Sequence, residues 1–65
     1  MIVIFSAHAK QRMKERNIDE RSIHKCLGSP DKQFSSNGEN IFVKRFDQRV
    51  IVVIFKRTGD IHYVI

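Results

Sequence analysis

The chain has very few cysteines, because Cys26 is the only one among its 65 residues. No internal disulfide bond can form, which suits a reducing cytoplasm. The apolar pattern around this residue, IHKCL, predicts an inert thiol in the core. The candidate metal ligands also lack the paired spacing of a zinc site; they are His8, His24, His62 and Cys26. We therefore expect neither a metal centre nor a cofactor.

The sequence also lacks a long apolar segment. Its longest apolar run is VIVVIF at residues 50–55, far below the ~20 residues that span a bilayer. The opening MIVIF is too short for a secretory signal and has no basic flank. We expect a soluble, cytoplasmic protein.

Acidic residues are the minority among the charges. Seven acidic residues face twelve lysines and arginines, which leaves a net charge of +5 on a single domain covering residues 1–65. Such an excess favours polyanionic partners, either nucleic acid or an acidic protein. Many small soluble domains are basic without such a partner, so the charge alone leaves that alternative open.

The first half of the chain predicts one strand and two short helices. IVIF, residues 2–5, is rich in β-branched residues and reads as a strand. Ser6 can cap a helix over residues 7–16, and Asn17 can end it in the left-handed conformation. Asp19 can cap a second helix over residues 20–27, whose buried face would carry apolar residues at i, i+3 and i+4.

The second half predicts only strands. The segments are KQFSS at 32–36, ENIFVKRF at 39–46, RVIVVIFK at 49–56 and IHYVI at 61–65, with a hairpin at the NG of 37–38. The run 50–55 predicts a central strand covered on both faces, or on one face with a partly apolar second. The predicted fold is α+β, ordered β-α-α-β-β-β-β. Two N-terminal helices would pack on one face of a mainly antiparallel sheet of four to five strands.

The first predicted helix carries an unusual stripe of His8, Arg12 and Arg16 at four-residue spacing. Side chains four apart are neighbours on a helix, so the imidazole and at least one guanidinium would face a common spot. Guanidinium groups clamp phosphate oxygens, and an imidazole exchanges a proton near neutral pH. These groups could cleave RNA without a metal, by deprotonating the 2′-hydroxyl and stabilising the phosphorane.

A purely structural interpretation of this stripe stays open. Arg12 could pair with Glu15 or Glu20, and Arg16 could also turn to Glu20. His8 could donate a hydrogen bond to a strand carbonyl and seat the helix.

Two further groups of residues could contribute to a site. His62 and Tyr63 are adjacent on a strand and point to opposite faces, so one of them could serve as a second acid. Five cations could form a surface that follows phosphates, or could instead guard the sheet edges; they are Lys44, Arg45, Arg49, Lys56 and Arg57. His24 reads as a surface residue.

The motif F-S-x-H-A-x-x-R-M-x-E-R-x-I, from Phe5 to Ile18, resembles the opening of a widespread family of small bacterial and phage proteins. SPD at 29–31 and the β-rich second half are similar to that family as well. The family is grouped with the RelE/ParE-like toxin fold, which BrnT toxins share. The resemblance implies a RelE-like architecture and a metal-independent endoribonuclease, often linked to the ribosome and held in check by an antitoxin.

The resemblance carries over residue by residue only for His8, Arg12 and Arg16 among the groups able to handle a phosphate. In RelE-like nucleases the catalytic basic residues lie mostly on the sheet, with an acid near the C-terminus. The residues loosely comparable with these are Arg45, Arg49, His62 and Tyr63. ParE-like members attack gyrase and do not cut RNA, so this fold does not guarantee the chemistry.

Together these observations predict an RNA-binding protein that acts as a toxin-type endoribonuclease of the mRNA-interferase kind. His8 would be the general base or a phosphate contact, Arg12 and Arg16 would stabilise the transition state, and His62 or Tyr63 would be the acid. One alternative is a non-catalytic basic module that binds nucleic acid, an antitoxin or a host target. Another is a helix-turn-helix reader of DNA. The apolar IHYVI strand, at a sheet edge, could also pair two chains into a homodimer.

Overall fold

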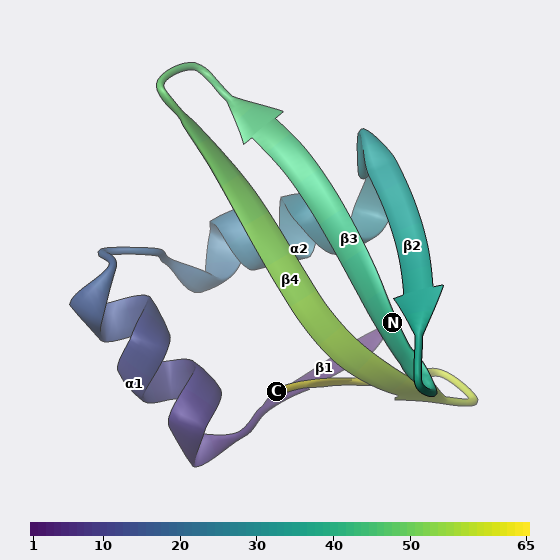
Figure 1. The fold of residues 1–65 in the computed structure, drawn as a ribbon. Coiled ribbons are helices and arrows are strands. Elements are labelled where there is room, and N and C mark those ends of the chain that lie inside the picture. Colours follow the sequence, from purple (N-terminus) through teal and green to yellow (C-terminus); the bar gives the residue numbers. More distant parts are fainter.

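The computed structural model describes residues 1–65 as one small α+β unit with two helices and five strands (Figure 1). Strand β1 (Ile2–Phe5) leads into α1 (Ala7–Glu15) and α2 (Glu20–Gly28). The strands β2 (Lys32–Ser36), β3 (Glu39–Phe46), β4 (Arg49–Thr58) and β5 (Ile61–Val64) follow. No helix is both long and apolar enough to cross a membrane.

Local side-chain chemistry fixes the ends of both helices. The Ser6 hydroxyl accepts a hydrogen bond from the Ala9 amide at 2.9 Å, and the Asp19 carboxylate accepts one from the Ser22 amide at 2.9 Å. Asn17 has a φ of 56° and ends α1 in the left-handed region. The predicted caps and the predicted helix stop are therefore confirmed.

The hairpin between β2 and β3 turns at Asn37 and Gly38, whose φ values of 52° and 77° are both positive. Positive φ at both central positions is the geometry that favours Asn-Gly in a two-residue hairpin. The hairpin expected at this dipeptide is confirmed.

The sheet has the strand order β1-β5-β4-β3-β2 and is mixed. Its first strand runs parallel to β5, with Ile2 opposite Ile61 and Phe5 opposite Val64, whereas the other neighbouring strands are antiparallel. The expected RelE-like arrangement, two helices packed on one face of a mainly antiparallel sheet of four to five strands, is therefore wrong. In the sequence both helices lie between β1 and the remaining strands. The last strand, β5, comes back to pair with β1 at the edge of the sheet.

The two helices also differ in how they meet the sheet. Helix α2 packs against β3 and β4, whereas α1 lies beyond the edge of β4 (Figure 1). The reason is the amount of apolar surface on each helix. Helix α2 buries Ile23, Cys26 and Leu27, while α1 buries only Ala9 and packs Met13 partly against the core.

The hydrophobic core lies between α2 and one face of the sheet. Strand β4, third in the sheet order, alternates buried and exposed residues, with Ile51, Val53 and Phe55 facing the core. The rings of Phe55 and Phe42 meet edge to face, with centroids 4.8 Å apart. The central strand is thus covered on one face only, and its second face is apolar and open to solvent.

Candidate anion-binding site

Helix α1 brings His8 and Arg12 into direct contact on its exposed side. The Arg12 guanidinium donates to His8 Nε2 across 3.5 Å, as the four-residue spacing predicts. A guanidinium can only donate, so Nε2 of His8 is the acceptor in this contact. The ring and the guanidinium are both accessible to a ligand.

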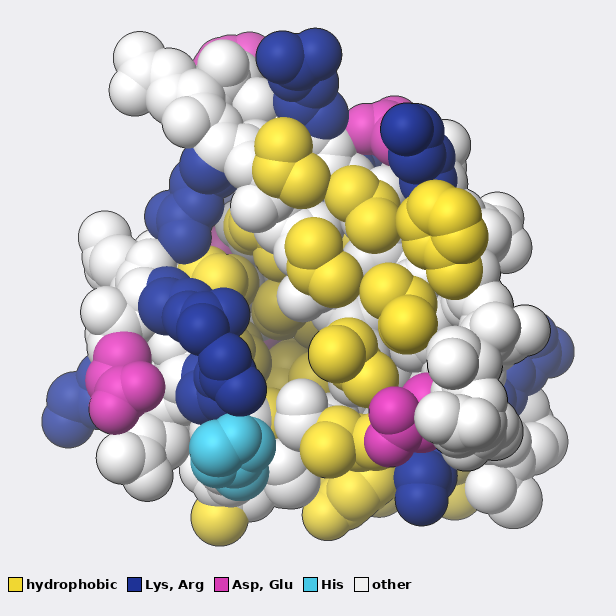
Figure 2. Space-filling view, viewed as in Figure 1, with side chains coloured by type: hydrophobic (Ala, Val, Ile, Leu, Met, Phe, Trp, Pro, Cys, Tyr) yellow, Lys and Arg dark blue, Asp and Glu magenta, His cyan; other side chains and the backbone are white.

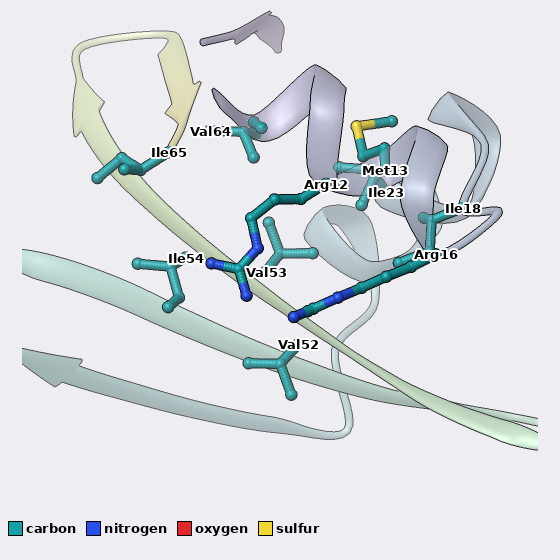
Figure 3. Close-up of a pocket in the computed structure, with 11 residues that line it drawn as sticks. Arg12, Met13, Arg16, Ile18, Ile23, Val52, Val53, Ile54, Val64 and Ile65 are labelled. Carbon is teal, nitrogen blue, oxygen red and sulfur yellow. The ribbon is translucent and has the colours of Figure 1, made fainter. Parts of the chain in front are cut away.

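Arg12 and Arg16 line the same hollow, which lies between α1 and β4 and has a volume of about 210 Å³. Figure 3 shows both side chains reaching from α1 toward Val52, with their guanidinium ends turned toward each other. The other lining residues are apolar: Ala9, Met13, Ile18, Ile23, Val52, Val53, Ile54, Val64 and Ile65. Two cations therefore face an aliphatic floor.

No carboxylate neutralises these arginines. The only ion pair in the structure joins the Met1 amino group to Asp60 at 3.5 Å. The pairings considered for Arg12 and Arg16 with acidic residues do not form, and Glu15 instead accepts a hydrogen bond from Gln11 at 3.4 Å. Apart from the Arg12 donor that contacts His8, the donors of both guanidinium groups are thus available to an anion.

His62 and Tyr63 point to opposite faces of β5, as their adjacency requires. His62 lies on the core side, where its ring stacks on Phe55 with centroids 5.1 Å apart and its Nδ1 atom is buried without a hydrogen-bond partner. Tyr63 is exposed on the open face, opposite Lys56 and Ile4 in the sheet register. Of the two candidate acids, only Tyr63 shares the open face with the exposed residues of β4.

The five cations proposed for a phosphate surface are divided between the two faces. Strand alternation puts Arg45 and Lys56 on the open face and the other three on the helix side. Lys44 Nζ donates to the Ser29 carbonyl at 2.8 Å, and the Arg57 guanidinium donates to the Gly59 carbonyl at 3.4 Å. The Arg49 guanidinium donates to main-chain carbonyls at the end of α1. The structure does not gather these residues into one surface.

Sequence reasoning missed the extent of the exposed apolar face. Figure 2 shows hydrophobic side chains covering the open face of the sheet, beside a hollow bordered by Lys and Arg. The exposed apolar side chains on this face come from four strands and the C-terminus: Ile2, Ile4, Phe34, Val50, Val52, Ile54, Ile61, Tyr63 and Ile65. The signal was the unbroken apolar run of β4, in which alternate residues must face opposite sides. Patches of this kind mark interaction sites in soluble proteins.

Asp19 and Cys26, which lie outside this site, have shifted pKa values. Hydrogen bonding to the Ser22 side chain, followed by the Ser22 amide, lowers the pKa of Asp19 below its ordinary 3.8. Burial raises the pKa of the Cys26 thiol above 9.0. No three His, Cys, Asp or Glu side chains gather closely enough to hold a metal ion.

A family model described as a domain of unknown function, DUF4258, matches residues 5–65. The chain belongs to the DUF4258 family. The match includes α1 with its three-residue stripe, the hollow and every strand except the first residues of β1. No curated protein and no solved structure matches the chain.

Proposed function

We propose that this DUF4258 chain binds RNA through His8, Arg12 and Arg16 and cleaves it without a metal ion. The observation that carries the proposal is the pair of arginines beside an exposed imidazole, with no carboxylate to neutralise them. A phosphate diester is the anion whose oxygens match guanidinium donors most closely. The net charge of +5 supports a polyanionic ligand.

The proposed reaction needs a base, a clamp and an acid. When the phosphate takes the Arg12 donors, Nε2 of His8 is released and accepts the proton of the ribose 2′-hydroxyl. The 2′-oxygen attacks phosphorus, and Arg12 and Arg16 stabilise the negative charge of the phosphorane. The bond from phosphorus to the 5′-oxygen then breaks, and Tyr63 donates the proton that this oxygen takes up. The products are a 2′,3′-cyclic phosphate and a free 5′-hydroxyl.

Tyr63 is chosen over His62 as the acid because of its exposure. It is exposed on the open face, whereas His62 is stacked in the core with a buried ring nitrogen. His62 therefore has no route to a ligand on the open face without rearrangement. We place the reaction in the cytoplasm, where RNA substrates and an antitoxin would be found.

The test is cleavage of a labelled single-stranded RNA in excess EDTA, followed by analysis of the new ends. We expect 2′,3′-cyclic phosphates, and we expect His8→Ala or Arg12→Ala to lower the rate by about 10²-fold or more. The matched controls are His24→Ala and Arg21→Ala, which remove the same residue types from the exposed side of α2. Equal cleavage by all four variants would show that the activity does not come from the stripe.

The second candidate is a non-catalytic module that binds nucleic acid or a protein such as an antitoxin. The exposed apolar face of the sheet favours this candidate, because nine large apolar side chains remain in contact with solvent there. Such a module would retard RNA in a gel without producing new ends.

A further inference from the structure

Part of strand β4 has no strand partner on one side. It pairs with β3 from Arg49 to Phe55, but with β5 only from Phe55 to Thr58. The last main-chain hydrogen bond along the β5 side runs from the Ile65 amide to the Ile54 carbonyl, at 3.0 Å. Residues 49–53 therefore present a free strand edge, a row of main-chain groups that can pair with another chain.

Helix α1 faces this free edge and turns it into a groove. The hollow of about 210 Å³ lies between them, and its walls come from both elements. Bonds from Arg49 to the carbonyls of Arg16 and Asn17 tie α1 to β4 at one end. Ile65 bounds the other end, where the pairing with β5 stops.

The charge of the groove is one-sided. Arg12 and Arg16 are the only residues with charged side chains among the eleven that line it. They reach over Val52 on the side of the open face (Figure 3). The only side-chain carboxylate that the strand register puts on the open face is that of Glu39, at the β2–β3 hairpin. The groove thus favours an occupant whose side chains are apolar where they face the core and acidic where they face the open face.

We propose that the groove binds an extended segment of a partner protein, which adds to the sheet as a strand along residues 49–53 of β4. Main-chain groups of the segment pair with the free edge. Alternate side chains are apolar and enter the hollow beside Ala9 and Val53. The intervening side chains are aspartate or glutamate and meet Arg12 and Arg16. This binding requires no cleavage of RNA and goes beyond the proposed function.

Other occupants fit these observations less well. An acyl chain has no donors or acceptors for the main-chain groups of a strand edge. A second copy of this chain would bring the same pair of arginines to the contact, with net charges of +5 on each side. RNA satisfies the arginines but not the aliphatic floor or the strand edge.

The test uses a fluorescein-labelled synthetic peptide in which valine and glutamate alternate, measured by anisotropy in the absence of RNA. Two companion peptides carry N-methyl groups on their main-chain amides, one at the valines and the other at the glutamates. Each therefore lacks the amide hydrogens on one side of the strand, which are needed for pairing. A third has lysine in place of every glutamate. We expect the parent peptide to bind, at least one N-methylated peptide to bind about tenfold more weakly or worse, and the lysine peptide not to bind.

A charge exchange provides the variant test. The double variant Arg12→Glu, Arg16→Glu should no longer bind the glutamate peptide and should bind the lysine peptide instead. The control variant Arg21→Glu on α2 should bind both peptides as the native chain does. The gain of binding excludes simple unfolding as the cause. The proposal is overturned if the parent peptide does not bind up to its solubility limit, or if both N-methylated peptides bind as well as the parent. A dimer of the free protein that dissociates on Val52→Lys would also overturn it, in favour of a second copy.

Because RNA is absent from these measurements, they separate the two proposals. If the His8→Ala variant loses RNA cleavage but binds the peptide as before, the proposal for the groove is supported independently of the nuclease site. Failure of the peptide to bind, with RNA cleavage intact, would reject only the groove.

Discussion

The Arg49 guanidinium donates a hydrogen bond of 2.8 Å to the main-chain carbonyl of Arg16, across 33 positions of the sequence. A second donor of the same group reaches the Asn17 carbonyl at 3.2 Å. Carbonyls at the end of a helix lack partners within the helix, and a cation there is also favoured by the helix dipole. Arg49 therefore attaches the end of α1, which carries the candidate site, to the first residue of β4.

Replacing Arg49 with alanine should loosen α1 rather than remove a phosphate contact. Two exposed hydrogen bonds from a charged group are lost, so the free energy of unfolding should fall by about 1 kcal/mol. Arg49→Lys should lose less of this free energy than Arg49→Ala but should not match the native chain, since an ammonium group lacks the fork that reaches both carbonyls. Urea unfolding of the three proteins measures this. Unchanged stability in Arg49→Ala would show that the attachment contributes nothing.

Two adjacent valines allow the contributions of the core face and the open face of β4 to stability to be compared. Val53 is 2% exposed and Val52 is 55% exposed. Truncating Val53 to alanine removes buried methyl groups and leaves a cavity, which should cost about 2–3 kcal/mol. Val52→Ala should change the free energy of unfolding by less than about 0.5 kcal/mol. Thermal or urea unfolding checks both, and equal effects would mean that the open face is covered in solution.

Acid should weaken the cap of α2. The folded-state pKa of Asp19 lies below its unfolded value, so its contribution to stability is fully present above about pH 4 and is lost as pH falls through the folded pKa. Asp19→Asn keeps a capping side chain but does not titrate. Stability measured between neutral pH and about pH 2 should therefore fall more steeply for the native chain than for Asp19→Asn. Parallel curves would contradict the assignment of this titration to Asp19.

The thiol of Cys26 should be unreactive in the folded protein. It is fully buried, its Sγ atom lies 3.6 Å from the Phe42 carbonyl, and burial raises its pKa. At about pH 8 a disulfide reagent should label it far more slowly in buffer than in urea. The labelling rate should follow the fraction of unfolded protein. Fast and complete labelling of the native chain would show that the α2 face opens readily.

Local structure was predictable because its causes are local. Ser6 and Asp19 cap the helices through amides three residues away, and Asn17 and the Asn37–Gly38 pair take the positive φ values that these residues tolerate. The contact between His8 and Arg12 follows from helical spacing alone.

The assembly of these elements was not predictable in the same way. Strand alternation does not specify which strand β1 will pair with, so its parallel pairing with β5 was missed. The position of α1 beyond the β4 edge depends on its narrow apolar stripe, of which only Ala9 is buried. The groove arises because β4 has ten residues and β5 only four, a mismatch that matters only after the strand order is known. Strand β5 lies inside the sheet, so it does not offer an edge to a second chain as expected for a homodimer.

The central claim is that Arg12 and Arg16 hold the phosphates of RNA, and the salt dependence of binding tests it most directly. Anisotropy of a labelled 2′-O-methyl oligonucleotide, which cannot be cleaved through its 2′-oxygen, gives the affinity across a series of salt concentrations. Each phosphate contact contributes about −0.7 to the slope of log K against log salt for single strands. We predict a slope shallower by about 1.4 in the Arg12→Ala, Arg16→Ala double variant and unchanged in Arg21→Ala. Identical slopes and affinities in all three proteins would contradict the account.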